Sequence, residues 1–218
     1  VSMELFTSYR EIATDQSKAG KVMRTILMRL GSEVYEQICL AAASADEDRG
    51  TAIYYVLHRA FGGGRCEKRV MEALADPYVS RVAKLALCVK REYHHYFGFV
   101  RFREISGRFL LAKIQPGNDI LSLMALHFSN RFPNENWVIY DEKRQKALCH
   151  EKGKECVMRK GVRIQVPGSA VGDMGEYEEL WQTFCDSISI EARRNEKLQK
   201  QMLALHFRSN MPEFSMKG

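Results

Sequence analysis

The hydrophobic pattern of this chain changes its period at Gly98, and this change constrains the fold more than any other feature. Before Gly98, apolar residues recur at helical spacing; after it, apolar and polar residues alternate as they do in strands. Helices followed by strands, and then by helices again, are typical of an α+β fold. We therefore expect N-terminal helices, a central antiparallel β-meander, and C-terminal helices that pack back onto the meander.

Capping and stop signals set the limits of the helices expected before Gly98. Asp15 is suited to cap the first helix, and Pro77 suits the first turn of the last one. The glycine run 62–64 ends the third helix; because it follows a helix and lacks a Gly-Lys-Ser/Thr ending, it does not form a phosphate-binding loop. The expected helices span residues 16–30, a segment starting at Ser32, and residues 51–61, 66–74 and 77–97.

The segments expected to form the sheet are short and joined by polar turns. A helix over 119–132 interrupts them, and a final helical region over 176–207 follows a loop rich in Gly, Pro and Ser. We expect a single domain over residues 1–218, with two lobes, 1–97 and 98–218, as an alternative. The expected strands cover residues 99–104, 108–114, 137–140, 146–150, 155–159 and 162–166.

The net charge of +6 is concentrated in one short stretch of the chain. Residues 81–115 carry eight Lys or Arg against two Asp or Glu, whereas residues 1–80 carry ten against eleven and residues 116–218 fifteen against fourteen. Concentrated positive charge with interleaved aromatic residues predicts a surface that binds a polyanion, and nucleic acid in particular.

A helical wheel over residues 78–97 separates an apolar face from a basic one. The basic face carries Arg81, Lys84, Arg91 and His95, a spacing that allows contacts with neighbouring phosphates. In the strand expected next, Arg101 and Arg103 share one face with Phe99, so they could pair phosphates and stack a base.

Other interpretations of these basic residues stay open. A solvated helix face explains the pattern of residues 81–95 equally well, and Glu92 or Glu104 could pair with an arginine and hold the helix–strand junction together. A second basic cluster contains Arg193 and Arg194; Glu191 and Glu196 dilute it, which favours a solvated face there.

Cysteine usage and hydropathy indicate the compartment. The six cysteines form no CxxC pair, no stretch approaches the roughly 20 apolar residues of a membrane span, and the N-terminal residues lack the pattern of a secretory signal. We expect a cytoplasmic protein with reduced thiols and no membrane partner. Cys149, His150 and Cys156 could begin a zinc site, but no fourth ligand has a suitable spacing, so we expect no metal and no cofactor.

Residues 91–102, REYHHYFGFVRF, carry a resemblance to a known family. Further matches follow in order along the chain: HF at 127–128, RFP at 131–133, Trp137 with Asp141 and Arg144, and RRN at 193–195 with LQ at 198–199. Over roughly residues 15–201 the chain is similar to a bacterial family of unknown function that is described as a DNA metabolism or repair protein.

The resemblance implies a DNA-repair role and a partner enzyme. Members of the family stand beside a radical-SAM protein of DNA repair or modification, or are fused to a uracil-DNA glycosylase-like domain. Because this chain has no cysteine triad for an iron–sulfur cluster, such radical chemistry would belong to the partner.

Three departures from the family pattern bear on the expectations. The family begins with a strand carrying Tyr-Asp-Gly, which this chain lacks, so we expect an edge strand to be missing and the N-terminus to be shortened. Residues 116–119 are Pro-Gly-Asn-Asp, whereas members of the family have Pro-Asp-His-Asn. The histidine of the family pattern is therefore absent from this position. The basic aromatic tail, Pro-Lys-Arg-Tyr-Trp, is replaced by LALHF at 203–207.

Three classes of function stay open, and the charge distribution favours the first, a non-enzymatic nucleic-acid-binding protein that supports a repair enzyme. The second is a DNA-processing enzyme, nuclease or glycosylase-like, with an acid/base or metal site around Glu92, His94 and Asp141. On the wheel Glu92 and His94 lie on different faces, which counts against a preformed pair. The third is a protein–protein scaffold that uses exposed aromatic residues such as Phe99 or Phe102.

Structural roles compete with the catalytic ones at several of these positions. We expect His94 to form a structural hydrogen bond and His127 to be a core histidine with its hydrogen bonds satisfied. Asp141 and Arg144 bracket an expected hairpin turn, where an ion pair would stabilise the turn.

Overall fold

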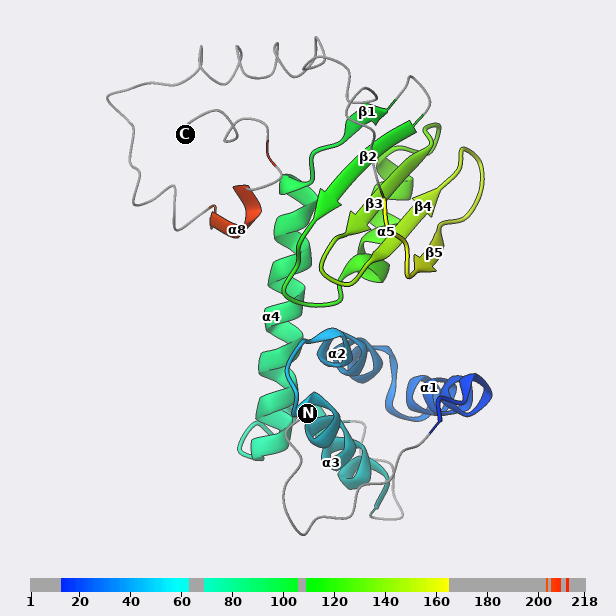
Figure 1. Ribbon diagram of the computed structural model, residues 1–218. Helices are drawn as coiled ribbons and strands as arrows, with labels where there is room; N and C mark the ends of the chain where they lie inside the picture. The colour runs from blue at the N-terminus through cyan, green and yellow to red at the C-terminus, as the bar shows by residue number, and fades with distance from the viewer. Residues whose placement is uncertain are drawn as a thin grey trace, which may run out of the picture. The chain divides into compact units, whose positions relative to one another are not determined.

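The computed structural model describes residues 13–62, 69–105, 109–164, 203, 205–208 and 211 (Figure 1). The chain divides into two compact units. The first contains Val1–Ala42 with Asp48–Lys84, and the second contains Ala43–Glu47 with Leu85–Gly218. Whether the two units behave as one domain stays a prediction.

The first unit consists of three helices, a 3₁₀ turn and the start of a fourth helix. These elements are α1 (Gln16–Leu30), α2 (Ser32–Ala43), α3 (Arg49–Gly62), η1 (Val70–Glu72) and α4 (Pro77–Phe99). Asp15 caps α1 by accepting a hydrogen bond from the Lys18 backbone N at 3.0 Å, and Gly31, with φ of 94°, ends it. The predicted limits of α1 and the starts of α2 and α4 are confirmed. The helix predicted over 66–74 is wrong in its described part, which holds only η1.

The start of α4 is fixed by Asp76 rather than by Pro77 alone. The Asp76 carboxylate accepts hydrogen bonds from the backbone N atoms of Tyr78 at 2.8 Å and Val79 at 3.2 Å. These bonds, the one from Val79 first, lower the pKa of Asp76, with help from the Arg59 guanidinium. An ionised cap at the helix N-terminus stabilises the first turn.

A five-stranded sheet forms the body of the second unit, in the order β1-β2-β3-β4-β5. The predicted α+β class is confirmed. Antiparallel pairing joins β1 to β2, β3 to β4 and β4 to β5. The strands are β1 (Arg103–Ile105), β2 (Phe109–Ile114), β3 (Trp137–Asp141), β4 (Lys146–His150) and β5 (Val157–Lys160).

The expectation of an antiparallel meander is wrong at its centre, because β2 and β3 pair in parallel, with Leu110 opposite Trp137. Helix α5 (Leu121–Arg131) lies between them in sequence and carries the chain back along the sheet before β3 begins. A parallel pair needs such a crossover, whereas a hairpin turn would have produced antiparallel pairing.

The two faces of the sheet are covered differently. Helix α5 packs on one face, where Phe128 lies against Trp137 with ring centroids 6.2 Å apart, and both side chains are buried (Figure 1). On the other face Ile105, Leu111, Tyr140 and Ala147 form a cluster, against which Val162 and Ile164 pack. The strand predicted over 162–166 is therefore wrong for residues 162–164, which cross this cluster without forming a strand.

Most of the predicted C-terminal helical region, residues 176–207, lies outside the described residues. Its described part includes α8 (Leu205–Arg208), which belongs to the second unit. None of the helices in the described part of the chain combines the length and the apolar character that a bilayer crossing requires.

Candidate nucleic-acid interface

Helix α4 separates its residues as the wheel predicts. Its buried side consists of Val79, Val82, Leu85, Ala86, Val89 and Tyr96. Arg81, Lys84, Arg91 and His95 are all exposed on the other side, the first two in the first unit and the last two in the second. Tyr78, in the first turn of α4, is also 38% exposed.

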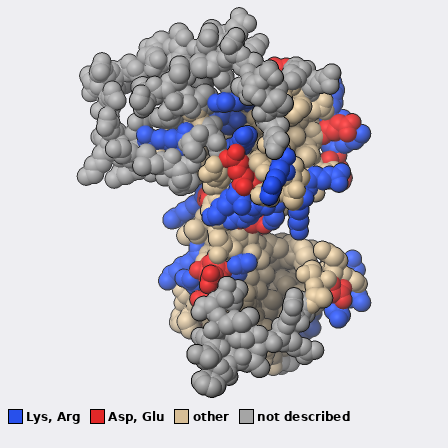
Figure 2. Space-filling model, viewed as in Figure 1, with Lys and Arg blue, Asp and Glu red and all other residues tan. Residues whose placement is uncertain are grey.

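Two of these cations, Lys84 and Arg91, form no ion pair with any residue that the structure describes. Both are exposed, so each keeps a charge that solvent screens but no carboxylate neutralises. Figure 2 shows Lys and Arg side chains grouped on the visible face of the second unit, with some Asp and Glu between them. An exposed cation without a carboxylate partner can bind a phosphate without first breaking an ion pair.

The strand expected to begin at Phe99 is wrong, because helical hydrogen bonding continues past that residue. The Val100 backbone N donates to the Tyr96 carbonyl at 3.0 Å, and β1 begins only at Arg103. Arg101 donates from Nη1 to the carbonyl of Gly98 at 2.7 Å and to that of Val100 at 3.4 Å. Its guanidinium thus binds the last carbonyls of α4, a position that suits a cation.

Arg103 is exposed on β1, so it presents its charge at the surface of the second unit. It shares a strand face with Ile105, which is buried in the cluster around Tyr140. The expected common face of Phe99, Arg101 and Arg103 does not exist, since only Arg103 belongs to the strand.

The aromatic residues near α4 pack against other rings instead of standing free. Phe99 is half-buried, and its ring centroid lies 5.1 Å from that of Phe207 of α8. Phe102 is half-buried as well and contacts Phe128 at 5.5 Å and Phe132 at 5.4 Å. The expectation that Phe99 and Phe102 are exposed is therefore wrong, and base stacking by Phe99 stays a prediction.

Glu92 anchors the loop that links β2 to α5. Its Oε1 accepts from the Gly117 backbone N at 2.6 Å, and its Oε2 accepts from the backbone N of Asn118 at 3.0 Å and from Nδ2 of the same residue at 2.6 Å. The Asn118 Oδ1 in turn accepts from the Ala45 backbone N at 2.9 Å. Glu92 therefore holds a structural junction, as one interpretation allowed, but its partner is a loop and not an arginine.

Asp141 approaches the same loop through Arg144. The fully buried Asp141 carboxylate accepts from the Arg144 backbone N at 3.1 Å and from Nη1 at 3.2 Å, which confirms the predicted turn-stabilising pair. The Arg144 guanidinium also donates to the carbonyls of Pro116, at 2.9 Å, and Gly117. Donors already occupy both carboxylates, so Glu92 and Asp141 each have a structural role at this loop.

His94 does not join Glu92 and Asp141. It is exposed on α4, and its nearest described ring is that of Phe97, with centroids 6.0 Å apart. The three residues considered for catalysis are thus divided between a partly buried polar junction and the helix surface. The sequence could not show this, because the junction depends on contacts between residues about 25 positions apart.

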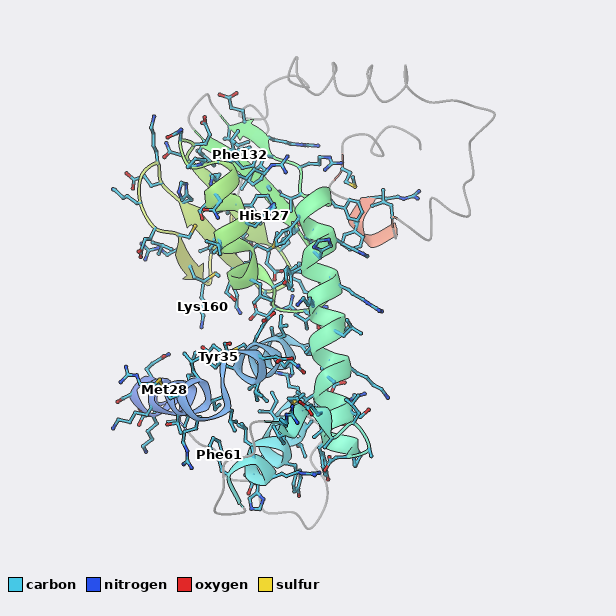
Figure 3. The ribbon with its side chains drawn as sticks, turned by 180° about the vertical axis from the view of Figure 1, so that it is seen from behind. Met28, Tyr35, Phe61, His127, Phe132 and Lys160 are labelled. Carbon is cyan, nitrogen blue, oxygen red and sulfur yellow. The ribbon has the colours of Figure 1, made fainter. Side chains whose placement is uncertain are left out.

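His127 of α5 is half-buried rather than a core residue, and the expectation of satisfied hydrogen bonds is wrong as well. Its ring stacks on Phe97 with centroids 3.9 Å apart, and its buried Nε2 has no hydrogen-bond partner among the described residues. His127 is labelled in Figure 3. The neighbours that enclose it are rings without acceptors, Phe97 and Phe128. Burial first, and then the charges of Arg131 and His94, lower the pKa of His127.

This environment predicts a pH dependence of stability. The pKa of His127 is lower in the folded state than its value of about 6.5 in the unfolded state, because burial of the stacked ring favours the neutral imidazole. The free energy of unfolding should therefore decrease as the pH falls from about 6.5 through the pKa of the folded state. Thermal unfolding between pH 8 and pH 5 should show a smaller loss for His127→Phe than for the wild type. An equal loss in both proteins would contradict this role.

The cysteines around β4 and β5 show no preference for the thiolate form. Burial raises the pKa of Cys149 and Cys156, whereas zinc binds the deprotonated thiolate. Among the described residues, no group of three or more His, Cys, Asp or Glu side chains is arranged to hold a metal ion. Arg193 and Arg194 lie outside the described residues.

The chain belongs to the family of the domain of unknown function DUF4130, whose sequence model matches residues 47–213. The matched span begins just before α3 and includes every described element from there to α8. No curated protein and no solved structure gives a significant match to the chain. The resemblance to a family of unknown function is thereby confirmed, and the DNA-repair association stays a prediction.

Proposed function

We propose that this protein acts in DNA metabolism or repair, where it binds nucleic acid and supports a partner repair enzyme, such as a radical-SAM protein. The observation that carries the proposal is the exposed basic side of α4, on which Lys84 and Arg91 form no ion pair with a described residue. The concentration of net charge in residues 81–115 supports it, as does the sequence resemblance described above.

In the second unit, the residues that would contact DNA are Arg91 and His95 of α4 and Arg103 of β1, all exposed. The positive charges of Arg91 and Arg103 favour phosphates without selecting a sequence, so the expected binding is non-specific and sensitive to salt. Arg101 would contribute to DNA binding indirectly, because its guanidinium binds the carbonyls at the end of α4. A DNA-processing activity of this chain has no comparable support, because Glu92 and Asp141 are engaged in the loop junction.

A double variant, Arg91→Ala with Arg103→Ala, tests this role of the basic residues. We expect a loss of affinity for duplex DNA of about tenfold or more at low salt, and a slope of log K against log salt that is smaller by about 2. Fluorescence anisotropy with a labelled duplex measures both quantities. The thermal unfolding of the variant should match that of the wild type, since both side chains are exposed.

A matched control removes two positive charges elsewhere in the second unit. Lys152 and Lys154 are exposed in the turn between β4 and β5, and Lys154 pairs with Glu151 at 2.7 Å. Lys152→Ala with Lys154→Ala should leave DNA affinity within about twofold of the wild type, because their turn adjoins β5, at the sheet edge opposite β1, and Lys154 is already paired with Glu151. If both double variants lose affinity equally, net charge alone explains the binding and the assigned surface is wrong.

A further inference from the structure

Three tyrosines of the first unit form an exposed cluster of rings. Tyr54, Tyr55 and Tyr78 are 60%, 44% and 38% exposed. Tyr55 of α3 stacks on Tyr78 of α4 with centroids 4.3 Å apart and an angle of 21° between the ring planes. Tyr54 meets Tyr55 edge-on at 5.4 Å, and His58 lies 5.9 Å from Tyr54. These three tyrosines are called the tyrosine cluster below.

The packing of α3 does not account for this exposure. Helix α3 buries Ala52, Val56 and Ala60, and Tyr54 projects from the opposite side at helical periodicity. Isolated exposed apolar residues are common, whereas exposed aromatic rings in mutual contact form a contiguous apolar patch of the kind found at binding sites. The sequence-based predictions missed this cluster. Its signal was the pair Tyr54-Tyr55 outside the apolar stripe of the helix.

The charges around the tyrosine cluster favour an anionic ligand. Arg81 is exposed and follows Tyr78 by three positions on α4, so the two side chains lie on neighbouring parts of the helix surface. The acidic residue beside the cluster, Asp76, is paired with Arg59 at 2.8 Å and caps α4 through the Tyr78 backbone N. Its negative charge is thus compensated inside the unit.

The geometry points to single-stranded nucleic acid as the ligand of the tyrosine cluster, an inference that rests on the proposed function. Aromatic side chains beside cations bind single strands because each unpaired base offers a ring face for stacking, whatever its identity. A duplex hides these faces inside its base stack and should gain nothing from the cluster. The first unit therefore supplies stacking, and selects unpaired DNA over duplex.

The experiment uses the full chain and two probes, an oligothymidylate of about 12 nucleotides and a duplex of equal length. In Tyr54→Leu with Tyr78→Leu, affinity for the oligothymidylate should fall about tenfold or more, since Leu keeps apolar contact but removes the stacking ring. Duplex affinity should stay within about twofold. Tyr35→Leu, a half-buried tyrosine of α2 (Figure 3), is the control variant and should leave both affinities unchanged.

The outcomes separate this inference from the proposed function. If the wild type binds neither probe, the proposed function fails. If it binds the duplex but not the oligothymidylate, or if the tyrosine variant binds both probes as the wild type does, the inference fails and the proposed function stands.

A measurement on the wild type covers the case in which the tyrosine variant does not fold. Tetranitromethane nitrates accessible tyrosines, and mass spectrometry locates the modified rings. Bound oligothymidylate should protect Tyr54 and Tyr78 from nitration. Equal nitration with and without the oligothymidylate would overturn the inference and leave a protein ligand as the occupant of the cluster.

Discussion

Replacing Arg144 by Ala is expected to lower the free energy of unfolding of the second unit by about 3–5 kcal/mol. The Asp141 carboxylate is 0% exposed, and it pairs with the Arg144 guanidinium at 3.2 Å. Without that partner a charge stays buried and uncompensated, which costs more than the pair contributes when intact. The carbonyls of Pro116 and Gly117 lose a donor in the same variant.

Urea unfolding monitored by circular dichroism measures this effect. Lys143→Ala is the matched control, because Lys143 is exposed in the same turn, and it should change the stability by less than about 0.5 kcal/mol. Arg144→Ala combined with Asp141→Asn should recover part of the loss, since no full charge then stays buried. A loss below about 1 kcal/mol for Arg144→Ala would show that the pair is not a structural element of the unit.

Glu92→Ala is expected to cost about 2–3 kcal/mol, because three donors on Gly117 and Asn118 lose their acceptor together. Glu92→Gln keeps one carbonyl acceptor but places an amide group against the Asn118 donors, so its cost should be intermediate. Glu104→Ala is the control, since Glu104 is exposed on β1 and should contribute less than about 0.5 kcal/mol.

The Glu92 variants also separate a structural from a catalytic role. A structural role predicts that DNA binding and stability decline together, and that binding returns when a lower temperature restores the fold. A Glu92→Gln variant that folds as stably as the wild type, but loses a DNA-processing activity that the wild type shows, would favour the catalytic interpretation instead.

Local sequence signals predicted the helices well because capping is a local interaction. Asp15, Gly31 and Asp76 act within three or four residues of the backbone groups they satisfy, so the limits of α1 and the start of α4 could be predicted from the sequence. The exposed side of α4 followed from helical periodicity alone, since Val82 and Val89 must be buried if the helix packs at all.

Contacts between distant segments account for the failures. The parallel pairing of β2 with β3 depends on the direction in which α5 returns the chain, which strand periodicity does not reveal. Arg101 is a local exception: α4 extends past Gly98, where the sequence predicts a strand, and the guanidinium binds the nearby carbonyls of Gly98 and Val100. In the sequence, Glu92 and Asp141 are candidates for catalytic carboxylates. In the structure, Glu92 binds the loop of Gly117 and Asn118, and Asp141 contacts the same loop through Arg144.

Fluorescence-anisotropy titration of the wild-type chain with single-stranded, duplex and uracil-containing DNA, over a series of salt concentrations, tests whether the protein binds nucleic acid. We expect binding whose log affinity falls linearly with log salt, with a slope that reports the number of phosphates contacted. Absence of binding to every one of these DNAs at low salt would show that the protein does not bind nucleic acid. The basic side of α4 would then be a solvated helix face.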